Sequence, residues 1–499
     1  MRPVLSVGYV GSLMANGELR DVEARLQDAE RWIDTTANAR GGSKSSSTAM
    51  VVADEDEFRR LPSAIAMYRA AQAQILGDVP GTLAHARRAM ELAGEADHLG
   101  RGAAAGFLAL TYWGSGELEA AYRSWADAMA SLSKAGHVVD AVACARALAE
   151  IRIAQGRLRE AMSTYERGLQ LATEHSAPGL RGVADMHVGM SELYLEWNDL
   201  DAAIQHLLKS DELGPHAALA RNPYRSRVAM ARIREAEGDA DGALDLLRDA
   251  ERLYVSEYFP EVRPIAAMRA RICVFQGRLD EAQGWVRERG LSVDDELSYL
   301  REFEHITFAR VLVAQSAQDQ NPVRGAMALV DRLLEAAEGG KRERSVIEIL
   351  VLQALAHQRL GNIVGALVPL ERALTLAEPE GQARLFVDEG ASMAALLTAA
   401  AKHGIAPEYA RRLLEGFGHP DVRTHAGQPL VEPLSERELE VLRLLGTDLD
   451  GPGIAGELVI GLSTVRSHTK SIYAKLSVNN RRAAVRRGDE LGLRRRDKR

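Results

Sequence analysis

The sequence predicts an all-α protein in which a solenoid of helix pairs precedes a small helical domain at the C-terminal end. Three observations support this fold class. A turn residue recurs about every 40 positions along most of the chain. Apolar residues at helical spacing lie on both sides of each turn. Near the C-terminal end, a helix-capping pattern opens a series of short helical segments.

The recurring turns define the repeats. From Gly77 to Gly361, successive turn residues are separated by 39 to 44 positions, and an alanine stands five positions after each turn from Gly116 on. A small residue there allows the two helices of a pair to approach closely. Because one pair cannot bury its apolar face alone, neighbouring pairs are expected to stack into a continuous core. Residues 1–417 are therefore predicted to form a tetratricopeptide-like solenoid of about nine units, with turns at Gly17, Gly77, Gly116, Gly156, Asn198, Gly238, Gly277, Asn321 and Gly361 and alanines at Ala121, Ala161, Ala203, Ala243, Ala282, Ala326 and Ala366.

Two segments interrupt or end this pattern. The glycine- and serine-rich residues 41–47 are interpreted as a linker, because Ser43 separates Gly42 from Lys44 and a phosphate loop requires contiguous Gly-Lys-Ser/Thr. The helices predicted over 393–403 and 407–417 are expected to seal the solenoid. Residues 418–432 are rich in proline and glycine and are predicted to be a linker.

Residues 433–499 are predicted to form a separate helix-turn-helix domain. Ser435 and Glu438 match a capping box, and Pro452 suits the first turn of a second helix. A third helix is expected over 462–476, and a fourth over 481–490. The inward row of the third helix is Val465, Thr469, Ile472 and Leu476, and its opposite face carries Arg466, Ser467, Lys470 and Ala474.

The charge distribution agrees with one nucleic-acid-binding domain on an acidic body. Residues 433–499 carry a net charge of +5, whereas the whole chain carries −8. Basic and short side chains on the second helix of a helix-turn-helix suit a major groove, because cations attract phosphates and small residues allow close approach. A solvated helix face is the alternative interpretation of the same residues.

The C-terminal segment resembles the LuxR-type helix-turn-helix domain of bacterial transcription regulators. The matching words are LSERELEVLRLL, IAGEL, TVRSHTKSIYAKL and the closing AV and ELGL. Two departures are Gly451-Pro452-Gly453, where the family usually has Asn-x-Glu, and Gly461-Leu462, where it usually has Ser-Pro. The resemblance implies that DNA is contacted by Thr464, Arg466, Ser467, His468, Lys470 and Lys475, and that the dimer contact involves Ala484, Val485 and Gly488. His468 bracing the turn, and Val485 packing on its own domain, remain alternatives.

Most of the chain is similar to the large LuxR-type regulators of the MalT kind. The cues are the repeats, the segment 384–390 (RLFVDEG) and the C-terminal module. Those regulators usually begin with an ATPase module that carries a Walker motif. No such motif is present in this sequence, so ATP-driven switching and a bound cofactor are not predicted.

These features predict a cytoplasmic transcription regulator that binds double-stranded DNA as a homodimer. Its repeat domain is expected to sense an unknown effector or protein partner. The alternative is a protein-binding repeat scaffold with a degenerate helix-turn-helix that no longer reads DNA. The sequence contains no nucleophile elbow and no metal-binding spacing, so neither an enzyme nor a metal site is predicted. Cys144 and Cys273 are expected to be reduced, and no membrane segment is predicted.

Overall fold

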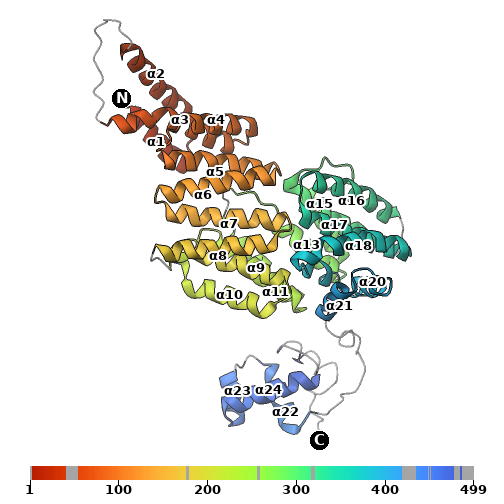
Figure 1. The fold of residues 1–499 in the computed structure, drawn as a ribbon. Coiled ribbons are helices and arrows are strands. Elements are labelled where there is room, and N and C mark those ends of the chain that lie inside the picture. Colours follow the sequence, from red (N-terminus) through yellow and green to blue (C-terminus); the bar gives the residue numbers. More distant parts are fainter. Residues whose placement is uncertain are drawn as a thin grey trace. The chain divides into compact units, whose positions relative to one another are not determined.

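The computed structural model describes residues 3–40, 54–175, 179–255, 259–315, 321–417, 434–447, 449, 451–476, 481 and 484–485. All elements in these ranges are helices, which confirms the predicted fold class. The chain divides into two compact units, Met1–Gly416 (unit 1) and Phe417–Arg499 (unit 2), shown in Figure 1. The interpreted linkers at 41–47 and 418–432 lie outside the described residues.

Unit 1 is a stack of antiparallel helices in which each helix packs mainly on its neighbours in the chain (Figure 1). Its first twelve helices are α1 (Pro3–Ala15), α2 (Val22–Arg40), α3 (Glu55–Ile75), α4 (Val79–Leu92), α5 (His98–Gly114), α6 (Leu118–Lys134), α7 (Val138–Ala154), α8 (Leu158–Glu174), α9 (Val183–Glu196), α10 (Leu200–Leu213), α11 (Asn222–Ala236) and α12 (Ala240–Leu253). The remaining α-helices are α13 (Ile265–Phe275), α14 (Leu279–Arg289), α15 (Glu302–Gln315), α16 (Asn321–Gly339), α17 (Glu343–Arg359), α18 (Ile363–Ala377), α19 (Arg384–Val387), α20 (Gly390–Lys402) and α21 (Pro407–Gly416). Short 3-10 helices lie at Pro215–Ala217, Tyr299–Arg301 and Glu378–Glu380.

The predicted turn residues end helices as expected, with one exception. Eight of the nine have φ between 64° and 83°, the left-handed region that glycine and asparagine adopt most easily. The exception is Asn321, where the prediction is wrong. Asn321 is the first residue of α16 and Pro322 the second, and proline is favoured in the first turn of a helix. The seven alanines that follow the turns are all fully buried, which confirms that the helices of each pair approach closely.

Unit 1 folds back on itself, so that its later helices contact its earlier ones. Helix α17 packs on α7, and α19 packs on α9. The indole Nε1 of Trp113 donates to the hydroxyl of Tyr299 at 3.3 Å. A Cβ atom on Gly116 would lie only 2.9 Å from the Cβ of Tyr299, so this approach requires a glycine. The first helices of two pairs, α7 and α9, therefore pack on helices much later in the sequence as well as on their neighbours in the chain.

Unit 2 contains three described helices around one apolar core: α22 (Glu436–Leu445), α23 (Gly451–Leu458) and α24 (Leu462–Leu476). Arg481, Ala484 and Val485 are also helical, and the rest of the predicted fourth helix lies outside the described residues. The core consists of Leu434, Val441, Leu442, Leu445, Ile454, Val465, Ile472 and Ala484. In neither unit is any described helix long and apolar enough to cross a membrane. Both cysteines, Cys144 and Cys273, are free and buried.

Candidate nucleic-acid interface

Helix α22 begins at the predicted capping box. The hydroxyl of Ser435 accepts a hydrogen bond from the backbone N–H of Glu438 at 3.3 Å, and the Glu438 carboxylate accepts one from the backbone N–H of Ser435 at 2.7 Å. The two reciprocal bonds satisfy donors that a helix start otherwise leaves without a partner. This arrangement fixes the first turn of α22.

The same carboxylate also holds α24 in place. The hydroxyl of Ser471 donates to Glu438 at 2.5 Å, and the ammonium of Lys475 lies 3.0 Å from it. Glu438 is only 4% exposed. Burial alone would raise the pKa of Glu438, but the hydrogen bonds from Ser471, the Ser435 backbone and Lys475 outweigh burial and lower the pKa to about 2. Glu438 therefore stays ionised and links the start of α22 to the C-terminal half of α24.

Two arginines complete the links between helices of this unit. Arg437 on α22 donates to the carbonyl of Leu458 at 2.9 Å, where α23 ends. Arg481 donates to the carbonyls of Leu445 and Thr447, each at 2.7 Å, at the C-terminal end of α22. Cations near helix carbonyls are favourable because the helix dipole places partial negative charge there. The sequence analysis missed both arginines, since their partners are backbone atoms more than 20 positions away.

The turn between α23 and α24 has an unusual backbone. Val459 has φ of 54° and is 89% exposed. A β-branched residue rarely adopts this left-handed conformation. The carbonyl of Gly461 then accepts the first bonds of α24, from the N–H groups of Thr464 and Val465. Helix α24 thus starts at Leu462, as predicted, although glycine replaces the usual serine in the preceding position.

Helix α24 has one buried side and one open side. Val465 and Ile472 are buried in the core, as the predicted inward row requires. Thr464, Ser467 and Lys470 are exposed, and His468 is half-buried. The side chain of Arg466 lies outside the described residues. Among the side chains that the structure describes on this helix of fifteen residues, the exposed ones are therefore two short polar side chains and one lysine.

The other predicted contact residues lie in different surroundings. Lys475 is mostly buried, and its ammonium is engaged by Glu438. Ala484 is fully buried in the core of unit 2, and Val485 is half-buried against it. Gly488 lies outside the described residues. The phosphate contact of Lys475 and the dimer contact both stay predictions.

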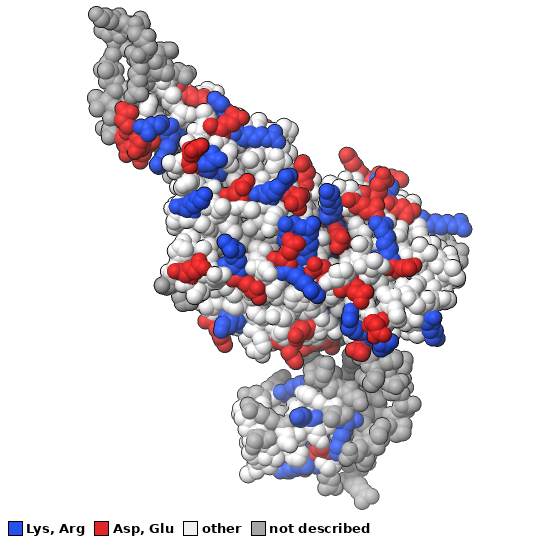
Figure 2. Space-filling view, in the orientation of Figure 1, with Lys and Arg blue, Asp and Glu red and all other residues white. Residues whose placement is uncertain are grey.

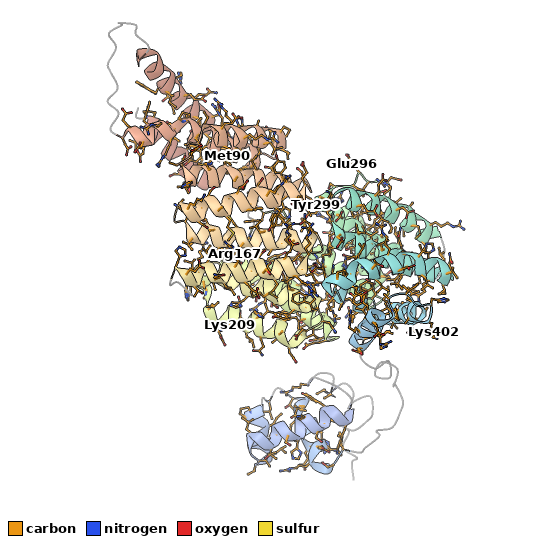
Figure 3. The ribbon with its side chains drawn as sticks, in the orientation of Figure 1. Met90, Arg167, Lys209, Glu296, Tyr299 and Lys402 are labelled. Carbon is orange, nitrogen blue, oxygen red and sulfur yellow. The ribbon has the colours of Figure 1, made fainter. Side chains whose placement is uncertain are left out.

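A groove runs along the inward side of α24, where Val465 and Thr469 line it, and reaches Gly451 and Pro452 at the start of α23. Among the exposed residues of α24, Lys470 also lines it, whereas Thr464 and Ser467 do not. Figure 2 shows that the charged side chains on the visible described face of unit 2 are mostly basic, whereas both signs are mixed over unit 1. In the ranges that the structure describes, no group of three or more His, Cys, Asp or Glu side chains is arranged to hold a metal ion. The exposed hydroxyls and the lysine of α24 can form hydrogen bonds and attract anions.

Comparison with known proteins gives two family matches. Residues 63–403 match the family model described as the MalT-like TPR region, and residues 432–487 match bacterial regulatory proteins of the luxR family. Two curated relatives are the HTH-type transcriptional regulators MalT of Klebsiella pneumoniae strain 342 and of strain ATCC 700721 / MGH 78578. Each is 26% identical over 371 residues, which cover 68% of this chain and 40% of the relative. The chain thus matches less than half the length of these relatives.

Among solved structures, a similar one is the crystal structure of a Rap protein complexed with Competence and Sporulation Factor. It superposes with a TM-score of 0.50 at 12% sequence identity, and covers 76% of this chain and 98% of that chain. At this level of identity the likeness concerns the helical-repeat fold alone.

Proposed function

Because this chain belongs to the family with a MalT-like TPR region and carries a LuxR-type module, we propose that it regulates transcription by binding double-stranded DNA through α24. The observation that carries the proposal is the two-sided character of α24. Its apolar row is buried, while Thr464, Ser467 and Lys470 are exposed on the second helix of a helix-turn-helix. In such motifs the second helix enters the major groove.

The proposed roles of the contact residues follow from their chemistry. Arg466 and Lys470 supply cations for phosphate or guanine, and Thr464 and Ser467 supply hydroxyls that bind phosphate or base edges. His468 stands beside them. The ammonium of Lys475 would have to contact a phosphate while it also keeps its ion pair with Glu438. Two modules would read paired half-sites through a homodimer, with Ala484, Val485 and Gly488 near the contact.

The repeat domain is proposed to sense an effector or a protein partner and to change how the modules are presented. Solenoids use their extended surfaces for such binding. The Rap structure mentioned above is complexed with Competence and Sporulation Factor, which supports ligand binding by a solenoid of this kind.

A second candidate function is a protein-binding scaffold whose helix-turn-helix does not read DNA. The specific observation in its favour is the start of α23 at Gly451-Pro452-Gly453, where two glycines replace residues that would otherwise stabilise a helix. The loss of Lys475 to an ion pair points in the same direction.

The salt dependence of DNA binding separates the two functions. The full chain is titrated onto double-stranded DNA that has been selected in vitro for binding to it, at several salt concentrations. A DNA reader gives a steep negative slope of log K against log salt, because phosphate contacts release counterions. The double variant Arg466→Ala/Lys470→Ala should lower the affinity and flatten the slope by about one for each lost phosphate contact.

Lys402→Ala is the matched control, since Lys402 is an exposed lysine of unit 1. Its slope and affinity should equal those of the wild type. Selection that yields no bound DNA, or a double variant that binds as tightly as the wild type, would support the scaffold instead.

A further inference from the structure

A small cavity inside unit 1 has an unusual excess of basic side chains. Its volume is about 50 Å³, and it lies among α9, α11, α13, α15, α17 and α19. One water molecule requires roughly 10–15 Å³ in this measure, so the space suits a group of several atoms. Four acidic residues line it, together with six arginines: Arg232, Arg263, Arg271, Arg310, Arg344 and Arg384.

Five of the six arginines are paired with carboxylates. Arg232 and Arg344 share Glu196, at 2.5 and 2.8 Å. Arg271 and Arg310 share Glu348, at 2.7 and 3.2 Å. Arg310 also contacts Glu389, and Arg384 contacts Asp388.

Arg263 is the sixth arginine, and it has no ion pair or hydrogen bond with any residue that the structure describes. Its guanidinium lies over the ring of Phe303, 4.8 Å from the ring centre, and its Nε atom is buried without a hydrogen-bond partner. Arg271 lies over the same ring at 4.3 Å. Burial, together with the neighbouring cations Arg232, Arg344 and Arg271, lowers the pKa of Arg263 to about 9. Glu348 acts in the opposite direction, but like charge outweighs it around this guanidinium.

Nearby arginines also have unused donors. The Nη1 atom of Arg344 and the Nε atoms of Arg271 and Arg310 are buried without hydrogen-bond partners. The four acidic residues that line the cavity carry less negative charge than their number suggests. Glu235 lines the cavity, and burial and the charge of Asp388 raise its pKa to about 7, so it is partly neutral at physiological pH. Buried donors without partners are costly, and they mark a place where an acceptor would bind.

We propose that this cavity binds an oxyanion, the carboxylate or phosphate group of a small effector, through Arg263 and the free donors of Arg271 and Arg344. The planar guanidinium matches both groups with two parallel hydrogen bonds. The proposal deepens the proposed sensing function of the repeat domain and rests on it. Since the lining helices come from α9–α11 on one side and α13–α19 on the other, the anion bridges parts of the solenoid that are far apart in the sequence.

The test measures the melting temperature of the full chain by calorimetry in chloride, in inorganic phosphate and in acetate, at equal ionic strength. A ligand of the folded state raises the melting temperature in a saturable manner. A shift with phosphate alone assigns a phosphate group, and a shift with acetate alone assigns a carboxylate. If neither anion gives a saturable shift beyond chloride, the proposal is overturned.

Arg263→Gln should abolish the anion-dependent shift. In chloride it should melt at the same temperature as the wild type or higher, because it removes a half-buried cation that has no carboxylate partner among the described residues. A variant that keeps the full shift, or that melts well below the wild type in chloride, contradicts the proposed role of Arg263. Arg263→Lys keeps the charge but not the planar geometry, and should give a weaker shift.

Arg227→Gln is the matched control, since Arg227 is exposed on α11, and its shift should equal that of the wild type. The salt slope of DNA binding is measured on the same variants. A failed anion site leaves the slope unchanged, whereas a failed DNA function removes the slope and leaves the anion shift in place.

Discussion

Unit 1 and unit 2 use buried charge in opposite ways. In unit 1, the carboxylates of Glu196 and Glu348 each hold two arginines, and the Glu196–Arg344 pair joins α9 to the distant α17. In unit 2, the single carboxylate of Glu438 collects the backbone of Ser435, the hydroxyl of Ser471 and the ammonium of Lys475. Removing such a carboxylate from unit 1 leaves buried cations with fewer partners. Removing Glu438 from unit 2 mainly removes a helix cap and the link between α22 and α24.

The largest expected effect is that of Glu348→Ala in unit 1. The substitution leaves Arg271 and Arg310 buried with one fewer anion, and breaking a buried ion pair in this way costs about 3–5 kcal/mol. All five tryptophans lie in unit 1, so urea unfolding of the full chain followed by tryptophan fluorescence reports this unit. Glu338→Ala is the control, because Glu338 forms an exposed pair with Arg372. A loss below about 1 kcal/mol would mean that the paired arginines contribute little.

The next largest effect is that of Glu438→Ala in unit 2. It removes the capping box and the tether to α24, and we expect a loss of about 2 kcal/mol from these two contributions. The check is hydrogen exchange of the α22 and α24 amides in the full chain, which should speed up in both helices. Glu440→Ala is the control, since Glu440 makes only an exposed pair with Arg437. Faster exchange confined to α22 would show that the carboxylate caps its own helix without holding α24.

The pH dependence of unit 2 sharpens the same point. The pKa of Glu438 falls from its ordinary value of 4.5 to about 2 in the folded unit. As the pH falls, Glu438 is protonated in the unfolded chain before it is protonated in the folded unit. The stabilisation that ionised Glu438 gives to the folded unit is therefore complete above pH 4.5 and is lost as the pH falls through 2. The protection factors of the unit 2 amides, which are corrected for the pH dependence of intrinsic exchange, should therefore fall over this window in the wild type. In Glu438→Gln the fall should be clearly smaller, and an equal fall would assign acid sensitivity to other groups.

The smallest expected effect concerns the turns. The left-handed turn residues of unit 1 are glycine or asparagine except for Lys341 and Ala406, whereas the turn before α24 carries the β-branched Val459. Val459→Gly should relieve backbone strain and stabilise unit 2 by roughly 0.5–1 kcal/mol, as the gain exceeds the added chain entropy. The measurement is slower hydrogen exchange in α23 and α24. Gly238→Val, which makes the reverse change in unit 1, should lower the urea midpoint of the tryptophan transition.

Local patterns made most of the fold predictable. The turn glycines and the alanines that follow them act within a few residues, and the capping box spans four. Asn321 misled because an asparagine before proline starts a helix as readily as it ends one. The candidate interface followed from the exposed row of α24, but the link between Glu438 and Lys475 did not, since 37 positions separate them. The buried ion pairs of unit 1 could not be predicted from the sequence for the same reason, because Arg344 and Glu196 are 148 positions apart.

The contacts between early and late helices have a consequence for cooperativity. In an open solenoid each repeat touches only its neighbours, so unfolding can start at one end and travel along the array. Here the side chain of Gln382 donates to the carbonyl of Gly156, and the backbone of Arg159 donates to Glu380 at 3.0 Å. These contacts close a loop of more than 200 residues. When one middle repeat unfolds, the later helices that contact it therefore lose these hydrogen bonds. We expect the central repeats to unfold together in a single transition.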